Sequence, residues 1–343
     1  TGGSNTAVGV LALDANTTAS NNTGVGHSAL SANTTGAFNV SLGAFTLDAN
    51  TTASHNTGIG YNSLSANTTG TRNVALGSLA LDANTTANDN TAIGYEALGA
   101  NTTGGFNTAV GRDSLKANTT GAYNVSVGAN SADALTTGGQ NVAIGHAALG
   151  SDTKGSKTIA IGESALFAQN FTSATDTYNV AIGENAGTAV TTGVANILIG
   201  GLTGDALTDA DYNTAIGHQA LSTDTLGSRS VALGYFALRN QNFTSATNSY
   251  NTALGFAAGE AITTGVQNTL IGGLAGDANT TGANNTTLGY LSLTANTTGS
   301  GNVALGKAAL ESNTTADNNT AVGKDTLRLN TTGHSNTAVG SLS

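Results

Sequence analysis

Aliphatic and small residues recur along the chain at fixed distances from twenty evenly spaced glycines, which we call the anchor glycines. They begin with Gly9, Gly26 and Gly43, and seventeen of the nineteen intervals between them are seventeen positions long, the other two being twenty-one. The residue before each anchor glycine is Val, Ile or Leu, as at Val8 and Val25. The residue three before it is Thr, Val or Ile, and a residue that is nearly always small separates the two. This period of two, rich in β-branched side chains, is typical of a short β-strand.

A second apolar column follows each strand, four residues after the anchor glycine. It holds Leu in fourteen of nineteen repeats, beginning with Leu13 and Leu30. The segment Asn-Thr-Thr-Gly or Asn-Thr-Thr-Ala often comes next, and another Asn, such as Asn5 or Asn22, opens eighteen of the twenty repeats. Asn, Gly and Thr suit turns, and no helical period runs far. The sequence therefore predicts an all-β fold: a parallel, β-roll-like solenoid of about twenty coils of about 17 residues, two of them lengthened to about 21, forming one continuous body over 1–343.

The strand pattern also predicts which side chains face inward. We expect the Val/Ile/Leu column, with Val8 and Val25, to face a dry core together with the Leu column. The small residues between would then form a flat outer strip that lets another chain approach closely, and three chains around an axis would bury it. The alternative is that the small strip fits the thin core of a single chain.

Two repeats are lengthened by four residues, at 167–178 and 239–250, and their inserted segments are near copies. The two copies are offset by seventy-two positions, so that 151–222 and 223–294 form a duplicated block. We interpret the insertions as tolerated loop growth, with a contact role as the alternative.

Composition narrows the function. The chain has 9% charged residues, a net charge of −10 and no Cys, which disfavours nucleic acid as a partner and excludes disulfides and thiolate chemistry. No apolar run is long enough to span a membrane, so we expect no membrane insertion by this segment. The absence of Met and the ends within a repeat suggest a piece of a longer or processed protein. These features fit an extracellular or surface-exposed location.

Candidate catalytic chemistry is sparse. The five His are scattered and do not form a triad-like or metal-ligating pattern, so we expect no enzymatic activity and no cofactor. Asp205, Asp209 and Asp211 lie close together in the sequence beside a glycine-rich segment and are weak calcium candidates, although the spacing typical of calcium-binding rolls is absent.

Two surface features could serve binding. Each Asn-Thr-Thr segment is formally a glycosylation acceptor, as at Asn16, Asn33, Asn50 and Asn67, with turn formation as the alternative role. The position after the anchor glycine carries Tyr61, Tyr95, Tyr235 and Tyr290, which could contact surface glycans or neighbouring chains or could shield the corners.

The unit Asn-Thr-Ala-Val-Gly-x-x-Ala-Leu, as in 5–13, 107–115 and 319–327, resembles the head repeats of trimeric autotransporter adhesins. It is also similar to repeats of phage tail fibres and other secreted fibrous proteins. The resemblance extends over nearly every repeat, although those head repeats are typically shorter than the repeats of this chain. It implies a non-enzymatic fibre on a cell or virion surface.

The sequence thus favours an extracellular structural fibre or adhesin shaft that associates with itself as a homotrimer. A subunit that stacks end to end into a filament is one alternative, because open coil ends carry unpaired strand edges. An ice-binding solenoid is another, since regular Thr ladders can present a flat array of hydroxyl groups.

Overall fold

A computed structural model describes residues 2–343. Over these residues the regular secondary structure consists of short parallel strands joined by turns, and successive strands form a parallel β-solenoid of about twenty coils. The predicted fold class is confirmed. The chain divides into two compact units, Thr1–Thr177 and Tyr178–Ser343, and each carries one main-sheet strand per repeat.

The strands of the main sheet have three residues each. In the first unit they are β1 (Thr6–Val8), β2 (Thr23–Val25), β3 (Val40–Leu42), β4 (Thr57–Ile59), β5 (Val74–Leu76), β6 (Thr91–Ile93), β7 (Thr108–Val110), β8 (Val125–Val127), β9 (Val142–Ile144) and β11 (Ile159–Ile161). In the second unit they are β13 (Val180–Ile182), β14 (Ile197–Ile199), β15 (Thr214–Ile216), β17 (Val231–Leu233), β19 (Thr252–Leu254), β20 (Thr269–Ile271), β21 (Thr286–Leu288), β22 (Val303–Leu305), β23 (Thr320–Val322) and β24 (Thr337–Val339).

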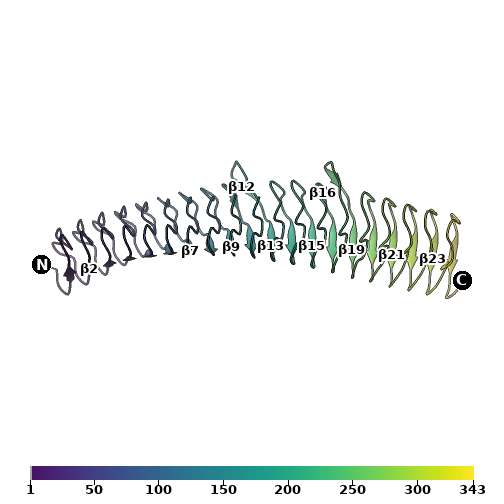
Figure 1. Cartoon of the computed structure of the whole chain (residues 1–343), viewed down its shortest axis with the longest axis horizontal. Helices are drawn as coiled ribbons and strands as arrows, with labels where there is room; N and C mark the ends of the chain where they lie inside the picture. The colour runs from purple at the N-terminus through teal and green to yellow at the C-terminus, as the bar shows by residue number, and fades with distance from the viewer. Residues whose placement is uncertain (1) are drawn as a thin grey trace. The chain divides into compact units, whose positions relative to one another are not determined.

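Because of the strand register, residues at the same position in successive repeats lie beside one another and form a ladder. Strand β1 pairs with β2 so that Thr6 lies beside Thr23 and Val8 beside Val25, and the same offset recurs from coil to coil. Within each unit, neighbouring strands lie side by side as successive coils stack (Figure 1). Because paired strands are about 4.8 Å apart, each column places like side chains at that spacing.

The middle residue of a main-sheet strand faces inward, and in most strands it is small. Ala75, Ala92 and Ala109 have no exposed surface, whereas Leu42 is 47% and Leu76 43% exposed. The prediction that the Val/Ile/Leu column faces the core is therefore wrong, and so is an outward small-residue strip. The alternative, in which the small residues fit the thin core of one chain, is what the structure shows.

The two predicted aliphatic core columns divide accordingly. Val8 is 57% exposed and Val25 is only partly buried, while Leu13 is 8% and Leu30 0% exposed. The Leu column is thus confirmed as core, and the Val/Ile/Leu column lies on the outer face of the sheet.

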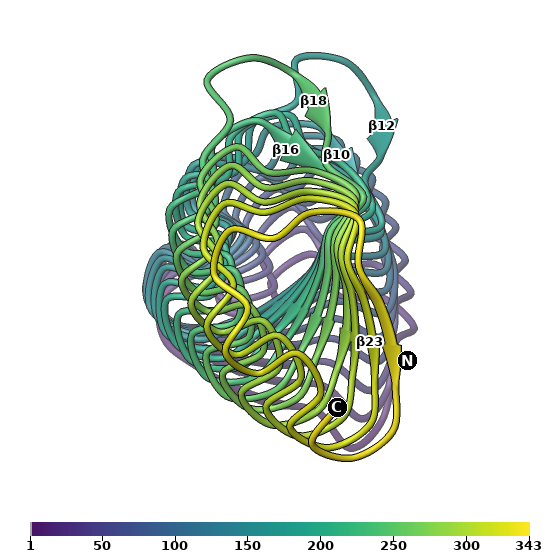
Figure 2. The same ribbon diagram turned by 90° about the vertical axis from the view of Figure 1, so that its right-hand side faces the viewer.

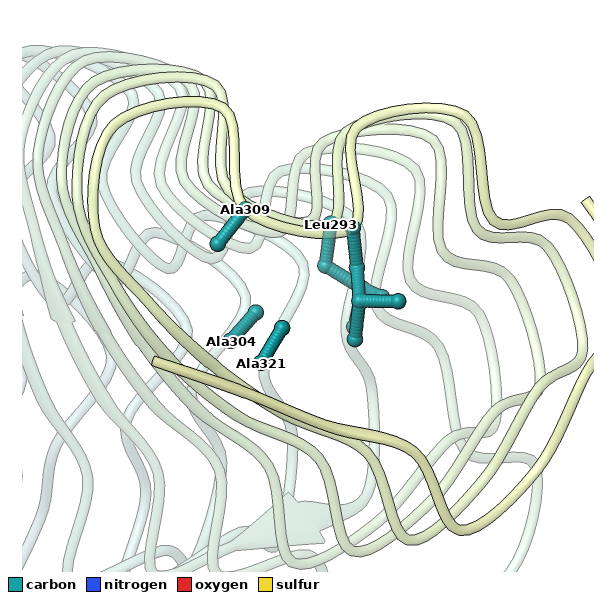
Figure 3. Close-up of a cluster of buried hydrophobic side chains, with 5 residues drawn as sticks. Leu293, Ala304, Ala309 and Ala321 are labelled. Atoms are coloured by element: carbon teal, nitrogen blue, oxygen red, sulfur yellow. The ribbon is translucent and has the colours of Figure 1, made fainter. Parts of the chain in front are cut away.

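The narrow interior explains this inversion. A methyl group added to Gly24 would already lie 3.3 Å from Cγ of Leu13, which approaches from the facing wall. Figure 3 shows the regular arrangement, with Ala304, Ala309 and Ala321 grouped beside Leu293. In the coils whose second apolar column holds Leu, that side chain fills the space, so a second large side chain in the strand would overpack it.

The anchor glycines are required by the stacking of the coils. Gly26 has φ of +136°, and a Cβ atom there would lie 2.3 Å from the carbonyl oxygen of Gly43 in the next coil. Gly9 meets Gly26 in the same way. Any side chain at these positions would force the coils apart.

Leu residues of the core column also occupy the left-handed region of φ, which the sequence did not indicate. Leu13 and Leu30 have φ of 53° and 54°. L-residues there lose about 1–2 kcal/mol, so burial of the Leu side chain must outweigh that cost in every regular coil.

The lengthened coils add small two-stranded parallel sheets outside the main sheet. They are β10 (Gly155–Ser156) with β12 (Thr175–Asp176) in the first unit, and β16 (Gly227–Ser228) with β18 (Thr247–Asn248) in the second. In Figure 2 the segments bearing β12 and β18 form arches that project beyond neighbouring coils. The duplicated sequence blocks therefore carry the same local structure.

Candidate functional surfaces

The outer side of the main sheet is an uncharged strip two side chains wide, which we call the aliphatic face. It consists of the first and third residues of each main-sheet strand: Thr, Val or Ile in one column, and Val, Ile or Leu in the other. On β3, Val40 is 39% and Leu42 47% exposed, and on β5, Val74 is 38% exposed. In the first unit alone, ten strands at about 4.8 Å make a continuous uncharged surface with an aliphatic side chain on every strand. Monomeric proteins rarely leave such a surface open to water.

Two ladders of buried asparagine run along the coils. In the first, which includes Asn5 and Asn22, the backbone N–H of each Asn donates to Oδ1 of the Asn one coil earlier, at 2.9 Å from Asn22 to Asn5. In the second, formed by the Asn-Thr-Thr segments, Nδ2 of Asn50 donates to Oδ1 of Asn33 at 2.9 Å and to the carbonyl of Ala53 at 3.1 Å. Aligned amides polarise one another, which strengthens the chain of hydrogen bonds.

This arrangement supports the alternative role of the Asn-Thr-Thr segments, turn formation, in the folded chain. Asn33, Asn50 and Asn67 have no exposed surface, and both hydrogens of each Nδ2 are donated to protein acceptors. Asn16 is half-buried, and its Nδ2 donates to the carbonyl of Ala19. A sugar on these nitrogens would replace buried hydrogen bonds, so the segments act as structural turns.

The Thr ladders are likewise engaged within the protein. The hydroxyl of the first Thr in the segment donates to the carbonyl of the equivalent Thr in the next coil, as from Thr34 to Thr51 at 3.1 Å. The second Thr is exposed, as at Thr69. The two therefore do not form one flat array of free hydroxyl groups.

The three aspartates proposed for calcium do not converge. Oδ1 of Asp209 accepts hydrogen bonds from the hydroxyls of Thr191 and Thr192, both at 2.7 Å, and these lower the pKa of Asp209. Asp211 accepts from the backbone N–H of Val194, and burial raises the pKa of Asp205. Across residues 2–343 no cluster of three His, Cys, Asp or Glu is placed to hold a metal ion.

The lengthened coils contain a buried polar network that sequence reasoning missed. Oδ1 of Asp152 accepts the backbone N–H groups of Gly155 and Phe171, and its Oδ2 accepts Nε2 of Gln169 at 2.7 Å. Gln169 also donates to the hydroxyl of Thr158, the residue that replaces Asn at the coil opening. Asp224, Gln241 and Ser230 repeat this network in the second unit. In the sequence, the replacement of the opening Asn by another residue at 158 and 230 was the sign that these coils differ from the others.

The aromatic residues named from the sequence lie at the surface, where several meet other rings. Tyr61, Tyr95, Tyr235 and Tyr290 are 53%, 48%, 44% and 52% exposed. Tyr235 stacks on Phe256 with ring centroids 5.6 Å apart, and Tyr61 meets Phe45 edge to face at 6.0 Å.

The Tyr61–Phe45 pair borders a shallow groove of roughly 420 Å³. The groove lies in the segments that follow strands β3 and β4, and it is also lined by Asp48, Asn62 and Ser65, with two alanines completing the wall.

Comparisons with known proteins leave the family open. The chain matches no protein-family model and no curated protein sequence. None of the described residues forms a helix long and apolar enough to cross a membrane.

Proposed function

We propose that the chain is a non-enzymatic, extracellular structural fibre or adhesin shaft that associates with itself through the aliphatic face. The observation that carries this proposal is the uncharged, regular strip of exposed Val, Ile, Leu and Thr side chains. It replaces the small-residue strip expected from the sequence as the contact surface.

The geometry of the face favours a second copy of the chain as partner. Both columns repeat with the coil, so a parallel copy presents the same spacing and can pack side chain against side chain along each unit. Burying Leu42 or Leu76 more fully would each contribute on the order of 1 kcal/mol, since complete burial of such a side chain gives about 1.5–3 kcal/mol. The sum over the strands of one unit is set against the cost of association, which is about 4–15 kcal/mol.

Three chains around an axis close such a contact without leaving an open face. The resemblance of the repeat to heads of trimeric adhesins also supports three copies. A structural role agrees with the hydrogen bonds of the Asn and Thr ladders. Their amides and hydroxyls bond to neighbouring coils and do not line a common substrate site.

Sedimentation of the intact chain tests the proposal. We expect a trimer at micromolar concentration and a shift toward monomer when Leu42 and Leu76 are both replaced by Asp, because their carboxylates would lose hydration in the contact between chains. The control is Thr69→Asp, which places the charge on an exposed turn and should leave the trimer intact. Circular dichroism verifies that the variants keep their strands.

Two results would contradict the proposal. A monomeric wild-type chain would remove self-association altogether. Filaments that persist in electron micrographs of the double variant would show end-to-end stacking instead of lateral contact.

A further inference from the structure

We propose that the groove beside Tyr61 binds a neutral oligosaccharide. The groove lies in the segments that follow strands β3 and β4, outside the aliphatic face, so this inference is independent of self-association. It assigns a class of ligand to exposed aromatic side chains. Beside them lie polar side chains whose hydrogen-bonding capacity is not fully used within the described chain.

The aromatic side of the groove is a platform built from consecutive coils. The ring of His27 lies 5.1 Å from Phe45, and Phe45 lies 6.0 Å from Tyr61 at an interplanar angle of 89°. Phe45 is 37% and Tyr61 53% exposed. Rings held at such angles offer both a face and an edge, and the apolar C–H face of a pyranose packs on such a surface. Phe45 and Tyr61 line the groove, and His27 of the preceding coil continues the row of rings beyond it, which favours an oligosaccharide over a single sugar.

The polar side of the groove supplies hydrogen-bonding capacity that the protein does not use up. Asp48 is half-buried and forms no ion pair within the described chain, and burial raises the pKa of its carboxyl, offset only in part by the backbone N–H groups of Asp48 and Ala49. The side-chain amide of Asn62 has no hydrogen-bond partner among residues 2–343. A carboxylate accepts from two neighbouring hydroxyls and an amide both donates and accepts, which matches the alternating hydroxyls of a sugar.

Charge decides between kinds of saccharide. Asp48 is the only charged side chain that lines the groove, and the whole chain carries a net charge of −10. Sialylated or sulfated sugars would therefore be repelled at the site. A neutral sugar brings hydroxyl donors to the carboxylate without that cost.

A second site on the same chain serves as an internal control. Tyr290 occupies the equivalent position after an anchor glycine, but Leu274 stands where Phe45 does. The carboxylate of Asp277, equivalent to Asp48, accepts a hydrogen bond from the hydroxyl of Thr294. The Tyr290 site thus lacks the second ring, and its carboxylate is already engaged.

The experiment uses the full chain and tetrasaccharides of glucose, mannose, galactose and N-acetylglucosamine, with sialylated and sulfated oligosaccharides as the acidic set. Saturation-transfer NMR and calorimetric titration measure binding. At least one neutral tetrasaccharide should bind, and Tyr61→Ala and Asp48→Asn should each weaken it by about tenfold or more, because a stacking or charged hydrogen-bond contact is lost. Tyr290→Ala should change affinity less than about twofold.

Three outcomes would overturn the proposal: no neutral oligosaccharide binds, the acidic set binds as well as the neutral set, or Tyr61→Ala binds like the wild type. Sedimentation of Tyr61→Ala should still show the wild-type assembly. A failure of saccharide binding is thereby separated from a failure of the fibre proposal.

Discussion

In part of the second unit, the large core side chain belongs to the strand instead of the Leu column. This difference allows a direct test of how the core is packed. In regular coils the strand carries Ala and the second apolar column carries Leu, as with Ala304 and Leu310. At β20 the order is reversed: Leu270 is fully buried in the strand, and Gly276 occupies the position of the Leu. A Cβ atom on Gly276 would lie 3.0 Å from Cδ2 of Leu270.

The two single substitutions should both destabilise this coil. Leu270→Ala removes a buried isobutyl group and leaves a cavity, which costs about 2–5 kcal/mol. Gly276→Leu forces a large side chain against Leu270 at about 1–3 kcal/mol, and the left-handed backbone adds about 1–2 kcal/mol. Gly276 has φ of +55°, which Leu310 matches at 52° elsewhere in the chain, so the backbone itself need not move.

The double variant should be far more stable than the sum of the single effects. It recreates the Ala-plus-Leu packing of the regular coils, so the cavity and the clash cancel and only the left-handed backbone cost of about 1–2 kcal/mol remains. The coupling free energy between the two positions should therefore be favourable and about 3 kcal/mol or more, at the upper end of the roughly 0.5–3 kcal/mol by which contacting residues commonly couple.

Native-state hydrogen exchange on peptides spanning residues 269–276 measures the local opening free energy, which suits a long repeat protein that need not unfold in one step. Gly276→Ala combined with Leu270→Ala is the matched control, because it places a Cβ on the left-handed backbone without filling the cavity. If the free-energy changes of Leu270→Ala and Gly276→Leu add within about 0.5 kcal/mol in the double variant, the two side chains do not fill the same space, and the reasoning is refuted.

Three further predictions concern single positions in the first unit. Gly60→Ala should destabilise its coil by more than about 3 kcal/mol in the same exchange assay, because its Cβ would lie 2.5 Å from the carbonyl oxygen of Gly77; wild-type protection would contradict the close approach. Asn67→Ala should cost about 2–4 kcal/mol by leaving buried ladder partners unsatisfied, whereas Thr69→Ala on the exposed turn should change stability by less than about 0.5 kcal/mol. Burial raises the pKa of the Asp82 carboxyl, so its charged form opposes folding. Stability should therefore rise as the pH falls from above the pKa of Asp82 in the folded chain to its ordinary pKa in the unfolded chain. Asp82→Asn should therefore stabilise the chain at pH 7 and lose that advantage near pH 3; an equal effect at both pH values in urea denaturation would exclude the charge as the cause.

The sequence by itself determined the repeat, the strand positions and the stacking. A glycine at nearly every seventeenth position, preceded by an alternation rich in β-branched residues, leaves little other than stacked coils, and each main-sheet strand ends at the residue before an anchor glycine. The Leu column was also predictable, because one large aliphatic side chain per coil must be buried somewhere. The lengthened coils were visible as insertions, although the buried Asp152 network inside them was not.

The tertiary structure alone decided which side of each strand faces inward. Hydrophobicity favours Val and Leu in the core, and a three-residue strand can turn either face inward without breaking its alternation. What decides is size: Leu13 and its equivalents approach from the facing wall and leave room for a methyl group opposite them. The small residue must therefore point inward, which forces the aliphatic columns out to the surface. Volume across the coil is a property of two segments brought together by folding, and the linear pattern of one segment does not contain it.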